Sequence, residues 1–138
     1  MRNPIQKSAR YARRGIAVVE LSVLLPVVTF LVLGSIQTAN LIYLKQSITA
    51  IAHIGALAAS KPNVDESEIV SRMQDMLDAR SLQANAVTVG YGETAYADIP
   101  LGERFEVIIS VDIQENTILH QVIPVSGDLQ ATLTGIKQ

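Results

Sequence analysis

The feature that most constrains the fold of this chain is a long run without charge, residues 21–44. Most of its residues are apolar, and as an α-helix it would be about 36 Å long at about 1.5 Å per residue. The hydrocarbon core of a bilayer is about 30 Å thick and requires about 20 helical residues. The run is long enough to cross a membrane, and we expect a transmembrane helix over about residues 17–44.

Charge is distributed unevenly on the two sides of this run. Residues 1–14 contain five basic residues and no acidic one, whereas residues 16–138 contain six basic and all thirteen acidic ones. Because Lys and Arg beside a membrane helix favour the cytoplasmic side, we expect the N-terminus inside and the C-terminal part outside. A secretory signal peptide is the competing interpretation, but its apolar core usually has about 7–15 residues, fewer than this run.

A helical pattern continues beyond the expected membrane exit. Apolar and small residues recur there at the spacings of three and four that a heptad repeat has: Leu41, Leu44, Ile48, Ile51, Gly55 and Ala58. The small residues at the end of this apolar stripe indicate close packing against another element. The pattern ends before Pro62, because the residue preceding a proline disfavours the helical conformation. We predict one helix over residues 16–60, with a kink or a loosened turn at Pro26.

Residues 61–138 are predicted to form a small outer domain of the α+β class. Asp65 and Glu68 have the spacing of a capping pair, which would begin a helix over residues 65–80. Residues 115–123 are ambiguous and would suit a short helix.

Strands are predicted where apolar and polar residues alternate. The alternation indicates three of them, at residues 86–89, 105–113 and 129–135. Residues 93–102 contain a proline and a glycine and are predicted to be a connecting loop. Three short strands suffice for one antiparallel sheet with the helix packed on one face. The expected fold is therefore a long N-terminal helix followed by a small helix-and-sheet domain.

The composition argues against several classes of function. The chain has no cysteine, so disulfides, thiolate metal sites and cysteine nucleophiles are not expected. It has no tryptophan and few other aromatic residues, which argues against stacking on single-stranded nucleic acid. His53 and His120 are the only histidines and lack the spacing of a helical metal pair, and no glycine-rich phosphate loop is present. We therefore expect no enzyme activity, metal, cofactor, small-molecule substrate or nucleic-acid partner.

Glu20 is an acidic residue at the very start of the apolar run. A charge at the centre of a bilayer costs about 2.5–3.5 kcal/mol or more, and less near the interface. Considered alone, Glu20 would equally well be an interfacial carboxylate that pairs with Arg13 or Arg14.

The residues before Glu20 resemble the class III signal of type IV pilin-like proteins. The similarity rests on basic residues that precede a glycine, on the apolar run that follows, and on a glutamate five residues later: Arg10, Arg13, Arg14, Gly15 and Glu20. In that family a membrane peptidase cuts after the glycine on the cytoplasmic face. The resemblance implies a cut between Gly15 and Ile16, loss of residues 1–15, and pairing of Glu20 with the N-terminal amine of a neighbouring subunit.

More narrowly, residues 13–60 resemble the TadE-like pseudopilins of the tight-adherence (type IVc) pilus system. The elements of the family pattern are an Arg-Gly pair, a Val-Glu pair, a Leu-Pro pair, a polar-aromatic segment and a stretch of small residues. In this chain they are Arg14-Gly15, Val19-Glu20, Leu25-Pro26, Leu41-Ile42-Tyr43 and residues 55–59.

The resemblance implies a minor pilin or pseudopilin of the bacterial inner membrane, with a single membrane pass and a periplasmic or extracellular C-terminal domain. Such a protein would prime or enter the pilus, with the apolar stripe packed against helices of other subunits. The implied partners are the membrane, the prepilin peptidase, a major Flp-type pilin, a second minor pilin and the inner-membrane assembly platform. The alternative is an uncleaved single-pass anchor whose outer domain binds a partner in a secretion or assembly complex. A membrane-tethered enzyme is a more remote third hypothesis.

Overall fold

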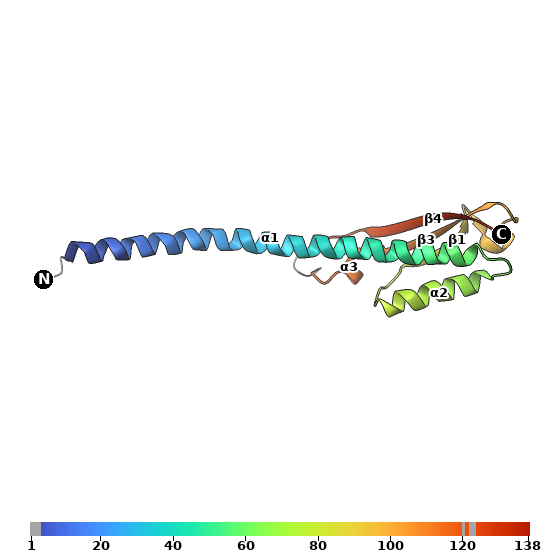
Figure 1. Ribbon diagram of the computed structural model, residues 1–138, viewed down its shortest axis with the longest axis horizontal. Coiled ribbons are helices and arrows are strands. Elements are labelled where there is room, and N and C mark those ends of the chain that lie inside the picture. Colours follow the sequence, from blue (N-terminus) through green and yellow to red (C-terminus); the bar gives the residue numbers. More distant parts are fainter. Residues whose placement is uncertain (1–3, 120, 122–123) are drawn as a thin grey trace. The chain divides into compact units, whose positions relative to one another are not determined.

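The computed structural model of this 138-residue chain describes residues 4–119, 121 and 124–138, with side chains from residue 18 onward. Its elements follow one another along the chain as labelled in Figure 1: α1 (Pro4–Ala59), α2 (Glu66–Ala79), β1 (Ala86–Tyr91), β2 (Thr94–Ala95), the short 3-10 helix η1 (Tyr96–Asp98), β3 (Arg104–Asp112), α3 (Ile113–Asn116) and β4 (Asp128–Ile136). The α+β class predicted from the sequence is confirmed.

The chain divides into two compact units, residues 1–38 and residues 39–138. The described part of the first unit is helical, and all its side chains from Val18 to Val32 are exposed. Helix α1 is α-helical on both sides of Pro26, where a kink or a loosened turn stays a prediction. We call residues 39–138 the outer unit.

Hydroxyl groups in the first unit are bonded to the backbone of their own helix. Four side chains each donate to a carbonyl oxygen four residues earlier, at 2.7–2.8 Å: Ser22, Thr29, Ser35 and Thr38. An unsatisfied polar group in hydrocarbon costs several kcal/mol, so these bonds remove an obstacle to placing the segment in lipid.

The sheet of the outer unit is antiparallel throughout, with the strand order β2-β1-β3-β4. Strand β3 is central and pairs with β4 over its whole length, from Arg104 opposite Ile136 to Asp112 opposite Asp128. The predicted alternation in β3 is confirmed, because every second side chain from Phe105 to Val111 is buried. The predicted loop over residues 93–102 instead contains β2 and η1. A two-residue strand is too short to show a period in the sequence.

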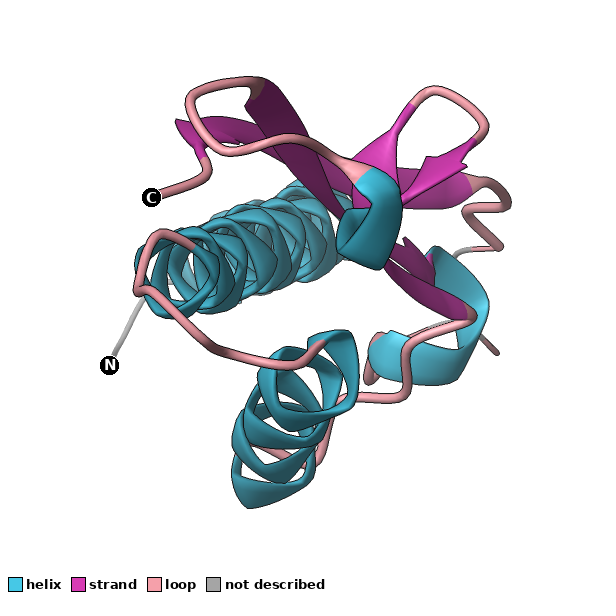
Figure 2. Cartoon of the chain, turned by 90° about the vertical axis from the view of Figure 1, so that its right-hand side faces the viewer, coloured by secondary structure: helices cyan, strands magenta, loops and turns pink. Residues whose placement is uncertain are grey.

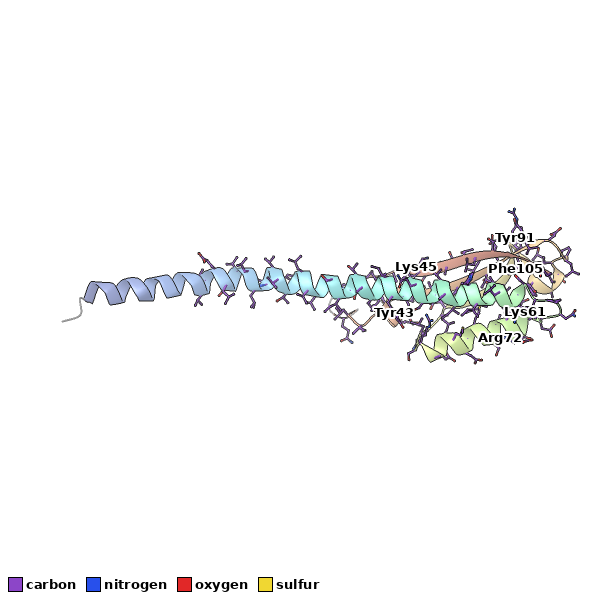
Figure 3. All side chains as sticks on the ribbon, in the orientation of Figure 1. Tyr43, Lys45, Lys61, Arg72, Tyr91 and Phe105 are labelled. Atoms are coloured by element: carbon purple, nitrogen blue, oxygen red, sulfur yellow. The ribbon has the colours of Figure 1, made fainter. Side chains whose placement is uncertain are left out.

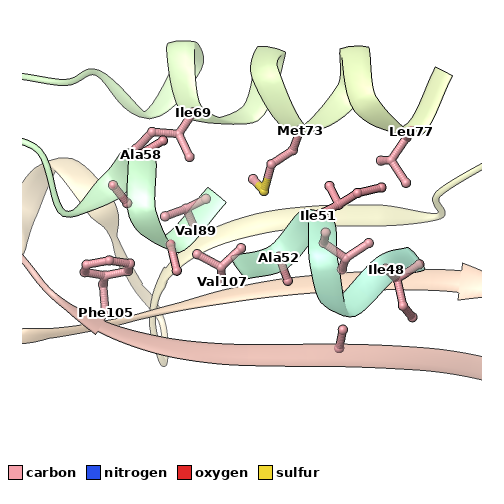
Figure 4. Packing of buried hydrophobic residues seen from close by; sticks show 14 of the residues in the cluster. Ile48, Ile51, Ala52, Ala58, Ile69, Met73, Leu77, Val89, Phe105 and Val107 are labelled. Atoms are coloured by element: carbon pink, nitrogen blue, oxygen red, sulfur yellow. The ribbon is translucent and has the colours of Figure 1, made fainter. Parts of the chain in front are cut away.

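The core of the outer unit lies between the sheet and the two longer helices. Figure 2 shows the strands on one side and α1 and α2 on the other. Figure 4 shows the layer between them, in which side chains of α1 and α2 meet those of β1 and β3: Ile48, Ile51, Ala52, Ala58, Ile69, Met73, Leu77, Val89, Phe105 and Val107. Burial of this apolar surface is the main force that holds the unit together.

Gly55 is required where α1 approaches α2 most closely. A Cβ atom at this position would lie 3.3 Å from Cγ1 of Val107 and would overlap the sulfur of Met73. The close packing predicted from the small residues of the stripe is therefore present, but its partners belong to the same chain.

This packing corrects the expectation about the apolar stripe. Leu44, Ile48, Ile51, Gly55 and Ala58 are all buried within the outer unit, and Leu41 is half-buried. The stripe cannot contact helices of other subunits while α2 and the sheet cover it. The expected packing against other subunits is therefore wrong for this face.

Two smaller expectations are also corrected. The side chain of Asp65, the residue before α2, makes no capping hydrogen bond. Glu68 forms an ion pair with Arg72 at 2.7 Å, one turn along the helix, so the predicted capping pair is not formed. Helix α3 begins at Ile113, before the ambiguous region of residues 115–123, and ends at Asn116. It therefore covers only the start of the region in which a short helix was expected. His120 lies outside the described residues.

Candidate functional site

The predicted cleavage site lies within helix α1. The backbone is helical at Gly15 and Ile16, as it is at Arg10, Arg13 and Arg14, the basic residues of the expected class III signal, to which we also assign leader recognition and topology. The side chains of Arg10, Arg13, Arg14 and Ile16 precede the described side chains. For residues 4–15 of the expected leader, the structure therefore shows a helical backbone.

Glu20 is exposed on α1 and is flanked by exposed apolar side chains. Val18, Val19 and Leu21 are between 61% and 65% exposed. Among the side chains that the structure describes, none forms a hydrogen bond or an ion pair with the Glu20 carboxylate. Four residues, about 6 Å along the helix axis, separate Glu20 from the backbone of Ile16. A carboxylate in this setting requires a cation from elsewhere if it is to remain charged beside lipid.

Residues 18–59 contain one stretch that is long and apolar enough to cross a membrane, and the most apolar window of it is fully exposed. The later part of this helix is different, because Leu44, Ile48 and Ile51 are in the core of the outer unit. A membrane span would therefore lie in the stretch before residue 44. This helix is a candidate single membrane span, consistent with the predicted single-pass protein.

The side of α1 opposite the apolar stripe is not covered by the outer unit. It carries side chains spaced by three, four and seven residues, which we call the outer α1 face: Tyr43, Gln46, Ala50, His53 and Leu57. Tyr43 is 55% and Leu57 is 57% exposed. A shallow groove of about 430 Å³ runs along part of this face and is bounded by Leu133 of β4. Sequence reasoning missed this face because its heptad positions are less apolar than those of the buried stripe.

Lys45 connects α1 to the open edge of the sheet. Its ammonium group donates a hydrogen bond to the backbone oxygen of Gln130 in β4. Figure 3 shows Lys45 and Tyr43 on the same short part of α1. Lys45 also borders the groove, so the groove lies between α1 and the free edge of β4.

The far end of α1 is held by the connection between β2 and β3. The buried hydroxyl of Tyr96 donates a 2.5 Å hydrogen bond to the backbone oxygen of Ala59. Lys137 Nζ donates to the backbone oxygens of Tyr96, Ala97 and Ile99 at 2.9, 3.3 and 2.8 Å, and it lies 4.6 Å from the centre of the Tyr96 ring. These contacts fix the end of β4 to the end of α1.

Within the described part of the chain, the structure shows no group of three or more His, Asp or Glu side chains that could hold a metal ion. A polar pocket of about 410 Å³ lies near the end of α1 and is bordered by Lys61, Asp65, Glu66 and Lys137. Its charges are of both signs, so it favours no single ligand charge.

Comparison with known proteins gives one family match. Residues 15–57 match the family model TadE, described as TadE-like protein. The match begins at Gly15 and ends near the end of α1, so it confirms the predicted TadE-like resemblance over the long helix. No curated protein and no solved structure matches the chain. The match covers 43 of the 138 residues, and these include the exposed apolar stretch that is a candidate membrane span.

Proposed function

Since residues 15–57 carry the TadE-like segment, we propose that this protein is a minor pilin or pseudopilin of the tight-adherence pilus. In this proposal it is cut between Gly15 and Ile16 and then assembles with other pilins to prime or form part of the fibre. The observation that carries the proposal is Glu20, an exposed carboxylate five residues after the glycine in an otherwise apolar helix.

Cleavage would change the electrostatics around Glu20 in a simple way. Removal of residues 1–15 takes away five basic side chains and creates one α-amino group on Ile16. Such an amine has an ordinary pKa of about 7.7–8.0 and is mostly protonated at neutral pH. Glu20 follows Ile16 by four residues, so an amine of its own chain or of a neighbouring subunit supplies the missing cation. Pairing in this way lowers the cost of keeping a carboxylate beside lipid.

The outer α1 face is the part of the outer unit that we propose for contact with other subunits. Its position opposite the buried stripe leaves Tyr43 and Leu57 exposed to a second helix, with the half-buried Ala50 between them. Their seven-residue spacing is that of a helix–helix seam. The exposed membrane segment before it offers the same kind of contact within the bilayer.

The remaining elements of the proposal follow from this role. The N-terminus is cytoplasmic and residues 61–138 lie in the periplasm or outside the cell, as the basic residues before the span favour. The partners are the prepilin peptidase, a major Flp-type pilin, a second minor pilin and the inner-membrane assembly platform. The role is structural rather than catalytic.

The deciding experiment is an intact mass and an N-terminal sequence of the protein purified from its native membrane. A start at Ile16 supports prepilin processing. A start at Met1 overturns it and favours the alternative, a permanent single-pass anchor whose outer domain binds a partner. In that case Glu20 becomes an interfacial carboxylate close to Arg13 and Arg14.

A further inference from the structure

The first observation concerns the direction of β4 within the outer unit. Near its start, Gln130 of β4 accepts a hydrogen bond from Lys45, close to the beginning of this unit on α1. Near its end, Lys137 is bonded to Tyr96, which is bonded in turn to Ala59 at the end of α1. Strand β4 therefore runs in the same direction as α1. The connection between β3 and β4 consequently lies at the end of the unit at which α1 enters from the membrane segment.

The second observation is that this connection carries no charged side chain. Residues 116–127 contain no Asp, Glu, Lys or Arg, in an outer part of the chain that is otherwise acidic. Ile118 is 79% exposed, and no other large apolar side chain in the described part of the protein is more exposed. An apolar side chain so fully exposed indicates a contact surface when it belongs to a larger apolar segment.

The third observation is that the base of the connection is held firmly. The amide nitrogen of the Asn116 side chain donates to the backbone oxygens of Gln83 and Asp112, both at 2.8 Å. The amide oxygen of Asn116 accepts from the backbone nitrogen of Gln83 at 2.7 Å. Figure 1 shows α3 beyond the end of the sheet at which β4 begins. Ile118 is therefore presented from a fixed support two residues away.

From these observations we propose that Ile118 and the neighbouring Leu119 form a second membrane contact. They enter the interfacial layer of the leaflet through which α1 leaves the bilayer, and they hold the outer unit against the lipid surface. The inference rests on the proposed function in one respect, namely that the helix before residue 44 spans a membrane. Lipid is the partner that fits, because the connection lies at the end of the outer unit at which α1 enters, and because it combines an exposed apolar side chain with the absence of Asp, Glu, Lys and Arg.

The absence of lysine and arginine specifies the kind of lipid contact. Residues 116–127 contain one histidine, His120, but no Lys or Arg for anionic headgroups, and Glu115 directly before them is acidic. Attachment therefore depends on apolar side chains and not on lipid charge. Tyr43 lies two residues before Lys45 on α1, near the same end of the outer unit, and is 55% exposed. Aromatic residues prefer the interfacial zone of a bilayer, so Tyr43 fits a contact at this end.

The absence of native cysteine allows a clean labelling experiment. The full-length protein is reconstituted in phosphatidylcholine vesicles with a single fluorophore at Ile118→Cys. The matched control is Leu101→Cys, which is 74% exposed and lies near Lys137 at the opposite end of the unit. We expect lipids with a nitroxide near the headgroup to quench the label at position 118 several times more strongly than the label at 101. Equal, weak quenching at both positions would overturn the inference.

A third label separates this inference from the proposed function. A fluorophore at Val27→Cys, within the span, reports insertion through quenching by a nitroxide deep in the acyl chains. Failure of the label at 27 contradicts the membrane span, whereas failure of the label at 118 alone contradicts only the second contact. A label at 118 that is shielded from aqueous iodide but not quenched by lipid would show coverage by protein, and this outcome also overturns the inference.

A substitution tests the same contact without a label at Ile118. Ile118→Asp should abolish lipid quenching of a fluorophore at Leu119→Cys, whereas Leu101→Asp should leave that quenching unchanged. Addition of phosphatidylglycerol to the vesicles or of salt to the buffer should have little effect, since no charge attraction is involved. Strong dependence on anionic lipid would contradict the apolar contact.

Discussion

The hydroxyl of Tyr96 donates a 2.5 Å hydrogen bond to the backbone oxygen of Ala59, the last residue of α1. The last carbonyl groups of a helix have no partner within the helix itself. Tyr96 supplies one from a segment that is distant in the sequence, and its ring also packs edge-on against Phe105 at 5.7 Å between centroids. One side chain thus joins the end of the long helix to the sheet.

Removal of this hydroxyl should weaken the outer unit without disturbing its core. Tyr96→Phe keeps the ring but leaves the buried oxygen of Ala59 without its donor, so we expect a loss of about 1–3 kcal/mol in the free energy of unfolding. Denaturant unfolding of the full-length protein in detergent measures it. Tyr91→Phe is the matched control, because Tyr91 is 51% exposed and should tolerate the change. Equal effects of the two substitutions would contradict the role of the bond.

The same hydroxyl predicts a dependence of stability on pH. Burial raises the pKa of Tyr96 above its ordinary value of 10.0. The neutral form is therefore favoured in the folded state, and the contribution of Tyr96 to stability is fully present below pH 10. This contribution should fall as the pH rises from about 10 towards the higher folded-state pKa. Unfolding of the wild type and of Tyr96→Phe as a function of pH checks it, because the substitution should remove this part of the decline.

Gly55 predicts a steric effect at the contact of α1 with α2. Gly55→Ala places a methyl group against Met73 and Val107, and we expect a loss of about 1–3 kcal/mol in stability from overpacking. Gly34→Ala is the control, since a Cβ atom there meets nothing within 4 Å. Thermal unfolding of both variants in the same detergent gives the comparison. A stable Gly55→Ala protein would mean that the two helices are less closely packed than described.

The two opposite faces of α1 should respond differently to truncation. Ile51 is fully buried, so Ile51→Ala should cost about 2–5 kcal/mol in stability and unfold part of the outer unit. Leu57→Ala should change stability by less than about 0.5 kcal/mol, because Leu57 lies on the outer α1 face. Under the proposed function, Leu57→Ala should instead reduce copurification with other pilins. The reverse pattern would restore the original assignment of the apolar stripe to subunit contacts.

Glu20 predicts a defect in assembly that is separate from insertion. Glu20→Gln removes the charge, and an uncompensated charge in lipid is worth about 2.5–3.5 kcal/mol, which corresponds to more than a tenfold change in an equilibrium. In the proposed pair, Glu20→Gln leaves the Ile16 amine without its counter-ion, and that unpaired charge is the one that carries the cost. We expect normal membrane insertion and normal processing but at least a tenfold loss of incorporation into pili, measured by immunoblot of sheared fibres. Glu20→Asp keeps the charge and should be incorporated into pili more efficiently than Glu20→Gln. Normal incorporation of the Glu20→Gln protein into pili would contradict the proposed pairing of Glu20 with an N-terminal amine.

Gly15 predicts the site of processing. Gly15→Leu should block the cut, because the peptidase site inferred from the family resemblance requires a small residue before Ile16. The product would keep residues 1–15, and its greater mass is detected directly by mass spectrometry of the purified protein. Gly34→Leu lies in the same helix and serves as the control for general effects of a bulky residue. Processing of Gly15→Leu at the wild-type rate would argue against the cut at this position.

Several features of this protein could be predicted from local sequence, because each depends on a pattern within one segment. The uncharged run of residues 21–44 determined the long exposed helix. The alternation between Phe105 and Val111 determined strand β3, and the spacing from Gly15 to Glu20 pointed to the family whose model matches residues 15–57. In each case the chemistry of neighbouring residues was sufficient.

Only the tertiary structure decided what covers each face of α1. Two sets of residues have helical spacing, one containing Ile48 and Ile51 and the other containing Tyr43 and Leu57, and either could face another subunit. The outer unit buries the first set and leaves the second exposed. Periodicity shows which side chains share a face, but the partner of that face depends on contacts between segments far apart in the chain. For the same reason the sequence did not reveal the bond from Tyr96 to Ala59 or the position of Ile118 at the end of the outer unit at which α1 enters.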